Sequence, residues 1–270
     1  MSDSQVLLEI SPPVARMTFV NPDDGLMDEP MEQRFAEAVE TVLARQDVRV
    51  CLLAGDGTGS FVRHYDLKVL ARRGAAMAER GLVFGAERPV PEAPIHTAMR
   101  RMEGSDVIFV AALNGTAMGG GFEIALACDF RLVAAGPYQF GLPEINLGLL
   151  PGAGGTQRLP RIVGLARALE ITLLGQCLSP DDLARLGLVT GAPCADVLAE
   201  GDALSRRISA LPARAAAHIK HLVRGAAGPG ATDPGFGIER ALFCDLMVDP
   251  DSLRLVTEGA RGQRRITDAP

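Results

Sequence analysis

The sequence predicts an α/β fold in which alternating strands and helices are followed by helices alone. Short apolar runs alternate with stretches of helical periodicity early in the chain, and the pattern from residue 196 onward is helical and rich in alanine and arginine. The 270 residues suit one large domain or one domain with a small appendage. We therefore expect a core over residues 1–200 and a helical region over residues 201–270.

The first elements follow from local patterns. Residues 6–10 and 14–20 are extended segments separated by a Ser-Pro-Pro turn, which indicates a hairpin-like pair. Residues 28–45 carry apolar side chains at helical spacing. Residues 48–54 form an almost unbroken apolar run, typical of a strand that is covered on both faces.

The alternation continues through the middle of the chain. A helix-like stretch runs from residue 66 to about residue 88, where closely spaced prolines break it. The next expected elements are a helix at 95–103, a strand at 107–113, a helix at 121–127, a strand at 130–134 and helices at 156–163 and 165–174. Ser179 followed by Pro180 indicates a further helix start. A Gly/Pro cluster at 225–235 interrupts the helical region.

The composition excludes several classes of protein. The net charge of −6, without clustered cations, argues against a nucleic-acid partner. The acidic start lacks a signal-peptide pattern and no run of about 18 apolar residues occurs, so we expect a cytoplasmic protein with no membrane span. The five dispersed cysteines predict buried free thiols and neither a zinc site nor a disulfide framework.

The most informative stretch is residues 114–123, which read Asn-Gly-Thr-Ala-Met-Gly-Gly-Gly-Phe-Glu. A helix N-terminus presents free N–H groups, and glycine there lets a ligand carbonyl approach the backbone, so the turn suits an oxyanion or a phosphate. Glu123 lies about one helical turn beyond Gly120, so its carboxylate can face the same pocket. A plain tight turn, with the glutamate placed for the helix dipole, is the alternative.

A second stretch supplies another carboxylate. Residues 140–144 read Phe-Gly-Leu-Pro-Glu, and residues 151–159 read Pro-Gly-Ala-Gly-Gly-Thr-Gln-Arg-Leu. Pro143 restricts the backbone before Glu144 and therefore where that carboxylate points. Two carboxylates in different surroundings can divide acid and base roles. A solvated turn is the alternative, and spacing does not establish that Glu123 and Glu144 meet.

These motifs, with Cys-Asp at 128–129 between them, resemble in order and spacing the crotonase (enoyl-CoA hydratase/isomerase) superfamily. The resemblance covers about residues 107–190 and extends more weakly to 48–55 and the helical tail. It implies a crotonase-like spiral of ββα units with a helical C-terminal region that packs homotrimers, often dimerised into hexamers. It also implies an acyl-CoA thioester substrate, with coenzyme A as part of that substrate and no separate cofactor.

The resemblance further implies an oxyanion hole of two backbone N–H groups that hold the thioester oxygen. The middle glycine of the triple matches Gly120, and the second donor matches Tyr65 in the loop after the strand at 48–54. Four neighbouring residues are expected to contact the substrate: Arg63, His64, Asp66 and Gly119.

Glu123 and Glu144 match the two glutamates of hydratases. We therefore expect a lyase, an enoyl-CoA hydratase, in which one glutamate activates water for attack at C3 and the other manages the proton delivered to C2. An enoyl-CoA Δ3-Δ2 isomerase, or another acyl-CoA activity of the superfamily, is the second interpretation. A non-catalytic acyl-CoA-binding protein is the third.

One loop departs from the family pattern Phe-x-x-Gly-Ala-Asp, because residues 61–66 read Phe-Val-Arg-His-Tyr-Asp. His64 and Tyr65 replace two small residues, so the loop is reshaped, the acyl pocket is shortened or the Tyr65 hydroxyl lies near the oxyanion. Outward packing of both side chains is the alternative. The stretch at 67–106 is long for a plain hydratase, which leaves the acyl chain length open.

The remaining candidates are weaker. His218 and His221 are three residues apart on a predicted helix, which favours a solvated face over a metal site. Arg158 and Arg161 are interpreted as surface charges of a helix. Coenzyme A phosphates need cations, and Arg63 or a tail residue of a neighbouring subunit is expected to supply them.

Overall fold

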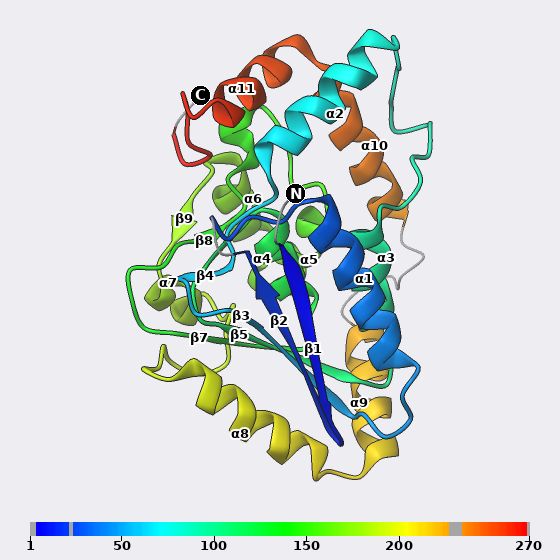
Figure 1. Ribbon diagram of the computed structural model, residues 1–270, viewed down its shortest axis with the longest axis vertical. Helices are drawn as coiled ribbons and strands as arrows, with labels where there is room; N and C mark the ends of the chain where they lie inside the picture. The colour runs from blue at the N-terminus through cyan, green and yellow to red at the C-terminus, as the bar shows by residue number, and fades with distance from the viewer. Residues whose placement is uncertain (1–3, 22–23, 227–233, 269–270) are drawn as a thin grey trace.

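Two β-sheets form the centre of the protein in the computed structural model, which describes residues 4–21, 24–226 and 234–268 (Figure 1). The first sheet has the order β1-β2-β3-β5-β7 and comprises β1 (Gln5–Ser11), β2 (Val14–Val20), β3 (Val50–Gly55), β5 (Ile108–Leu113) and β7 (Phe130–Val133). The second has the order β4-β6-β8-β9 and comprises β4 (Ser60–Val62), β6 (Thr116–Met118), β8 (Phe140–Gly141) and β9 (Cys177–Leu178). The β1–β2 and β8–β9 pairs are antiparallel, and the other pairs are parallel.

Consecutive strands pass back and forth between these two sheets. β3 lies in the first sheet and β4 in the second, and the chain repeats this step with β5 and β6 and again with β7 and β8. Helical segments follow each pair: α2 (Leu67–Glu79) and α3 (Pro94–Glu103), then α4 (Gly120–Ala127), then η1 (Glu144–Leu147), α5 (Gly155–Val163) and α6 (Leu165–Leu173). The predicted spiral of ββα units is therefore confirmed. Two further helices are α1 (Glu29–Leu43), before β3, and α7 (Pro180–Arg185), after β9.

The first sheet is covered on both faces. β3 and β5 are buried at every position, as their apolar sequences predict. On one face Leu53 and Phe109 belong to a core cluster shared with α1, α3 and α4, and on the other Leu52 packs with α8 (Val197–Ser209). A Cβ at Gly201 of α8 would lie 2.9 Å from Leu52 Cδ1, so the glycine permits the close approach of this helix.

The end of α2 differs from the prediction, because the helix stops well before the prolines that were expected to break it. Gly81 has φ of +60°, and its N–H donates to the Ala78 carbonyl while the Leu82 N–H donates to the Met77 carbonyl. These two hydrogen bonds form a Schellman motif, which ends a helix when glycine takes the left-handed conformation. The chain from Gly81 to the start of α3 is therefore free to line a cavity instead of extending the helix.

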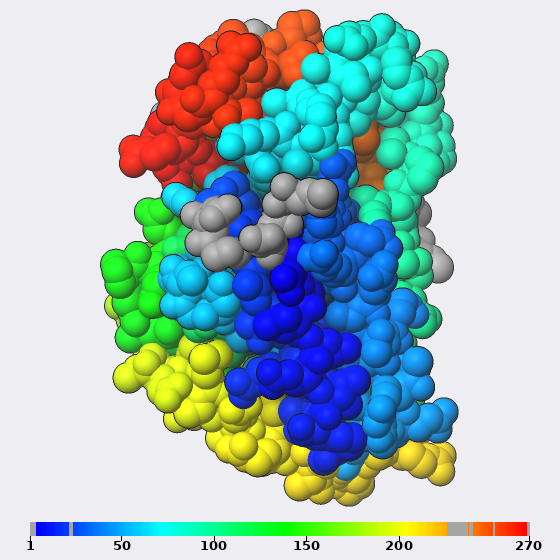
Figure 2. All heavy atoms as spheres, in the orientation of Figure 1, coloured from blue at the N-terminus to red at the C-terminus, as the bar shows by residue number. Residues whose placement is uncertain are grey.

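Beyond α8 the described chain consists of α9 (Ala213–Ala226), α10 (Pro234–Val248) and α11 (Pro250–Ala260). Lys220 of α9 is buried, donates to the carbonyls of Met102 and Val107 at 2.7 and 2.6 Å and pairs with Asp129 at 3.0 Å. At the opposite end α10 and α11 pack against α2 (Figure 1), and Figure 2 shows α11 and α2 side by side on the surface.

Two expectations about this region are limited by what is described. Most of the Gly/Pro cluster, residues 227–233, lies outside the described residues. The division at residue 200 stays a prediction. Across residues 4–21, 24–226 and 234–268, no helix is long and apolar enough to span a lipid bilayer.

Replacing Gly81 with alanine should destabilise the protein by about 1–2 kcal/mol, because a Cβ is unfavourable in the left-handed region. Gly85→Ala is the matched control, since Gly85 has no positive φ and a Cβ added there would meet no atom within 4 Å. Urea unfolding measures the difference in the free energy of unfolding. Equal midpoints for the two variants would show that the Schellman turn does not determine where α2 ends.

Candidate functional site

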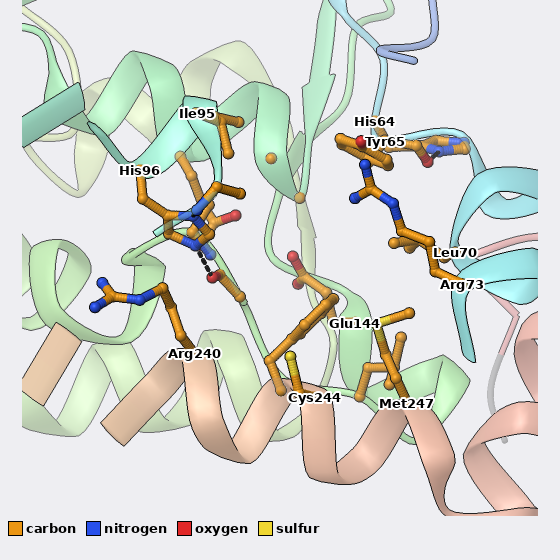
Figure 3. A pocket seen from close by; sticks show the side chains of 18 of the residues that line it. His64, Tyr65, Leu70, Arg73, Ile95, His96, Glu144, Arg240, Cys244 and Met247 are labelled. Carbon is orange, nitrogen blue, oxygen red and sulfur yellow. Dashed lines mark hydrogen bonds between the residues drawn. The ribbon is translucent and has the colours of Figure 1, made fainter. Parts of the chain in front are cut away.

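A cavity of about 180 Å³ lies between the N-terminus of α4, the loop before α2 and the inner face of α10 (Figure 3). Its walls come from elements far apart in the sequence, including α1, α3 and η1. The cavity brings together six residues that the sequence singled out: His64, Tyr65, Gly119, Gly120, Glu123 and Glu144. The motifs that were separate in the sequence therefore meet at one place.

Glycine occupies each of the three positions at the start of α4 for a different structural reason. Gly119 has φ of +50°, and its N–H donates to the Gly141 carbonyl at 3.0 Å. A Cβ at Gly121 would lie 2.0 Å from the Val62 carbonyl oxygen, so this glycine is required by packing. A Cβ at Gly120 would have only Ile95 Cδ1 within 4 Å, at 3.8 Å, so packing within the protein does not require glycine there. Because Gly120 has no side chain, an oxygen of a ligand can approach the N–H groups in the first turn of α4. The helix itself supplies no carbonyl partner for these N–H groups.

The backbone of Tyr65 faces the same turn. The His64 carbonyl accepts the Met27 N–H at 2.9 Å, and the Asp66 N–H donates to the Met27 carbonyl at 2.8 Å. A trans peptide points its C=O and N–H in opposite directions, so the Tyr65 N–H is directed away from Met27. On that other side the Arg63 carbonyl accepts the N–H of Met118, next to Gly119. The loop thus presents the Tyr65 N–H toward the start of α4.

The side chain of Tyr65 is anchored elsewhere. Its hydroxyl donates to Glu32 Oε2 at 2.6 Å, and Arg73 lies over its ring with 5.6 Å between the guanidinium carbon and the ring centroid. Burial, followed by the negative charge of Glu32, raises the pKa of the Tyr65 phenol. The ring is a wall of the cavity, and neither Tyr65 nor His64 packs outward. The hydroxyl is thus hydrogen-bonded to a carboxylate of α1.

Glu123 is held by the glycine-rich loop that follows η1. Its Oε1 accepts hydrogen bonds from the N–H groups of Ala153 and Gly155, both at 2.8 Å. The residue is 2% exposed. Burial raises the pKa of Glu123, and the two amides oppose that effect because they stabilise the carboxylate. The two glycine-rich motifs are therefore joined through this one carboxylate.

Two side chains hold that loop in place. Arg158 donates to the Ala153 carbonyl at 2.8 Å and forms a two-point ion pair with Glu103 at 2.9 and 2.7 Å. His96 Nδ1 accepts the Ala93 N–H, so Nε2 carries the proton and donates to the Gly152 carbonyl at 2.7 Å. Burial lowers the pKa of His96, which keeps the ring neutral.

The interpretation of Arg158 as a surface charge was wrong, because this side chain is only 5% exposed. The first turn of α5 faces the core, and the guanidinium reaches Glu103 at the end of α3. Burial of an arginine requires such a paired partner. Arg158 belongs to the motif at residues 151–159, but its position in the sequence gives no sign that its side chain is buried.

Glu144 begins η1 directly after Pro143 and is 7% exposed. A Cβ added at Gly119 would lie 3.1 Å from Glu144 Oε1, so the carboxylate sits directly beside the glycine turn. The left-handed Gly148, with φ of +69°, ends η1. Its carbonyl accepts a hydrogen bond from the Ser252 hydroxyl of α11. The helical region thus supports the segment that carries Glu144.

Arg63 and Asp66 lie outside this cavity. They line a neighbouring cavity of about 690 Å³, which shares His64, Leu67 and Ile266 with the first. Asp66 caps α2 by accepting the Lys68 N–H at 2.7 Å, which gives it a structural role. Arg63 is exposed and has no ion pair with any residue that the structure describes.

Several site residues had no signal in the sequence. Glu32 is buried in the cavity wall, yet it occupies a polar position in an amphipathic helix. His96 and Arg240 also line the cavity. His221 pairs with Asp106 at 2.8 Å on the surface, and among the described residues no group of three or more His, Cys, Asp or Glu is arranged to hold a metal ion. The cysteines are free, with Cys51 and Cys128 buried and the other three partly buried.

A two-sheet spiral with buried carboxylates beside a glycine turn defines an enzyme of the crotonase-type fold. A family model described as enoyl-CoA hydratase/isomerase matches residues 9–251. A probable enoyl-CoA hydratase of Bacillus subtilis is 32% identical over 202 residues, which cover 73% of this chain and 72% of that protein. The chain belongs to the enoyl-CoA hydratase/isomerase family.

Other relatives are longer or more distant. A peroxisomal fatty acid beta-oxidation multifunctional protein of Arabidopsis thaliana is 38% identical over 186 residues, which cover 68% of this chain and 24% of that protein. The chain thus spans about a quarter of such multifunctional relatives. The structure of EchA1_1 from Mycobacterium paratuberculosis superimposes with a TM-score of 0.78 at 28% identity over 96% of each chain. A putative enoyl-CoA hydratase from Streptomyces avermitilis has the same fold, with a TM-score of 0.82 at 24% identity over 98% of this chain and 92% of that one.

Gly121→Ala should destabilise the protein by at least about 2 kcal/mol, because its Cβ would overlap the Val62 carbonyl and the backbone must shift. Gly120→Ala should leave stability unchanged or slightly raised, since its Cβ meets no close atom and alanine favours a helix. Thermal unfolding of both variants measures the difference. A Gly121→Ala protein as stable as Gly120→Ala would contradict the packing described for α4.

Proposed function

We propose that the protein is an enoyl-CoA hydratase that adds water across the 2,3 double bond of an acyl-CoA thioester. The observation that carries this proposal is the pair of buried glutamates at one cavity, with Glu144 beside Gly119 and Glu123 one turn along α4. Family membership supports an acyl-CoA substrate. The reaction needs no cofactor beyond the coenzyme A that the substrate carries.

The thioester oxygen is placed between the N–H groups of Gly120 and Tyr65. Negative charge develops on that oxygen when water attacks C3, and fixed N–H donors stabilise it without reorganising in the transition state. Loss of one such donor typically costs about 3 kcal/mol of barrier. Because only backbone atoms take part, the bulk of Tyr65 is compatible with this role, and its phenol is hydrogen-bonded to Glu32.

The two carboxylates complete the addition. The oxygen of a water molecule bonds to C3 while one glutamate accepts its proton, and the other glutamate delivers a proton to C2. The sum is one H and one OH added to the double bond. We assign Glu123 and Glu144 to these roles jointly. The amides of Ala153 and Gly155 keep Glu123 in a fixed orientation throughout.

We assign coenzyme A to the neighbouring cavity, which shares His64 and Leu67 with the first as lining residues. Arg63 and Lys68 border that cavity and supply cations for its phosphates. The thioester then enters the smaller cavity past Tyr65.

Glu123→Gln and Glu144→Gln should each lower kcat for hydration of crotonyl-CoA by about 100-fold or more, which is the usual contribution of general acid–base catalysis. The assay is the loss of the conjugated thioester absorbance. Glu170→Gln, an exposed carboxylate on α6, is the matched control and should retain full activity. Gly120→Ala should keep the fold and lose activity, because its Cβ enters the space for the thioester.

Other outcomes separate the alternatives. Binding of coenzyme A without turnover of crotonyl-CoA would contradict the hydratase proposal and favour a non-catalytic acyl-CoA-binding protein. Dependence of Δ3-Δ2 isomerisation on only one of the two glutamates would favour the isomerase. Unchanged activity in both Gln variants would show that the two glutamates are wrongly assigned.

We also propose that the protein is a homotrimer or a hexamer. Apolar side chains are exposed on two helices, Leu165 and Leu173 on α6 and Leu222 and Val223 on α9. Light scattering after size exclusion should give three or six times the mass of 28.5 kDa. Leu222→Glu should shift the protein toward smaller species, and a monomer in the unmodified protein would overturn the assignment.

A further inference from the structure

Helix α10 lines the cavity with a stripe of residues that is apolar along most of its length and positively charged at one end. The residues of α10 that face the cavity are Arg240, Phe243, Cys244 and Met247. Their spacing is that of a single helix face, and the stripe is roughly 10 Å long at 1.5 Å per residue. Three of the four are apolar or sulfur-containing, whereas Arg240 carries a full positive charge at the end nearest His96 (Figure 3).

The charge of Arg240 is partly buried and only loosely paired. Its side chain is 14% exposed, and its two contacts are long, from Nε to the Val90 carbonyl at 3.3 Å and from Nη1 to Glu92 Oε1 at 3.4 Å. Among the described residues, Nη2 has no hydrogen-bond acceptor. Glu92 is more closely bound by Arg100, at 2.9 Å, and by Thr97, at 3.0 Å. Arg240 therefore retains unused donors next to the cavity.

The other polar groups near this end do not neutralise Arg240. His96 is neutral and uses both ring nitrogens, one for the Ala93 N–H and one for the Gly152 carbonyl. Burial lowers the pKa of His96, and the positive charge of Arg240 acts in the same direction. Glu32 is an anion, but it pairs with Arg73 at 3.7 Å and accepts hydrogen bonds from the Tyr65 hydroxyl and, at 3.3 Å, from the Ile95 N–H. This end of the cavity therefore favours an anion from outside the protein.

The position of Arg240 relative to Glu144 and Tyr65 indicates which part of the substrate would carry that anion. In Figure 3, Arg240 and His96 lie on one side of Glu144, whereas His64 and Tyr65 lie on the other. The proposed coenzyme A cavity opens on the side of His64. A thioester held at Tyr65 directs its acyl chain past Glu144, and the far end of that chain approaches Arg240.

We propose that Arg240 binds a carboxylate at the far end of the acyl chain, so that the preferred substrates are enoyl-CoA thioesters of dicarboxylic acids. This inference rests on the proposed function of the same site. A guanidinium pairs with a carboxylate through two parallel N–H···O hydrogen bonds, and Arg240 keeps donors available for them. A purely apolar acyl chain would leave this partly buried charge without such a partner.

Binding of saturated thioesters tests Arg240 without requiring catalysis. Glutaryl-CoA and adipyl-CoA carry the carboxylate, and pentanoyl-CoA and hexanoyl-CoA are the matched neutral chains. Calorimetry on the unmodified protein should show about 10- to 100-fold tighter binding of at least one dicarboxylic thioester than of its neutral counterpart, as expected for hydrogen bonds between charged groups. Equal affinities would overturn the inference.

Arg240→Gln should remove that preference and leave the affinity for the neutral thioesters within a few-fold. Arg254→Gln, an exposed arginine on the neighbouring α11, is the control and should keep the preference. An equal loss of affinity for both kinds of thioester in Arg240→Gln would show that Arg240 is only structural. If that variant does not fold, the comparison on the unmodified protein decides the question alone.

Kinetics separates this inference from the proposed function. The hydration of glutaconyl-CoA should exceed that of pent-2-enoyl-CoA in kcat/KM, and Arg240→Gln should abolish the difference. Tight binding of glutaryl-CoA without hydration of either unsaturated thioester would refute the hydratase and retain the carboxylate site. Hydration of both at equal kcat/KM would refute the carboxylate site and retain the hydratase.

Discussion

The carboxylate of Glu123 accepts hydrogen bonds from the N–H groups of Ala153 and Gly155, and the rest of the site depends on that interaction. It joins the helix that follows the glycine turn to the loop that follows η1. His96 and Arg158 then hold the loop from two sides through its carbonyl groups. A buried carboxylate with two amide donors is stable only where such a loop is rigid. The cavity therefore keeps its shape because its central acid is part of its scaffold.

The sequence predicts the parts of this arrangement that local backbone constraints determine. The left-handed Gly119, the close approach at Gly121 and the proline before Glu144 each leave glycine or proline in the sequence, although each motif alone is also compatible with an ordinary turn. The alternating buried strands are predictable for the same reason, because complete burial requires an apolar run. The spiral fold was predicted from the resemblance to the crotonase superfamily, which depends on several such motifs occurring in order.

Other residues escape sequence analysis because their role comes from contacts across the fold. Glu32 occupies a polar position of α1 that looks solvated until Tyr65 and Ile95 are brought against it. Arg158 resembles any surface arginine, since its partner Glu103 belongs to a different ββα unit. The effect of the bulk of Tyr65 on the site could not be predicted, because the sequence does not show whether its side chain or only its backbone faces the glycine turn. A side chain can change freely where only its backbone faces the turn, provided that another element accommodates the ring.

The origin of the cavity wall in α10 has a consequence for how this protein can diverge. The two glutamates and both glycine-rich motifs belong to the spiral, whereas the stripe from Arg240 to Met247 comes from a helix much later in the chain. Substitutions at Arg240, Cys244 or Met247 can alter what the cavity accepts without changing the two glutamates, whereas Phe243 also packs against Gly152 in the loop that orients Glu123. If the proposed function holds, selection can therefore change the preferred acyl group while the two glutamates stay constant, because the two features are encoded in separate stretches of the gene.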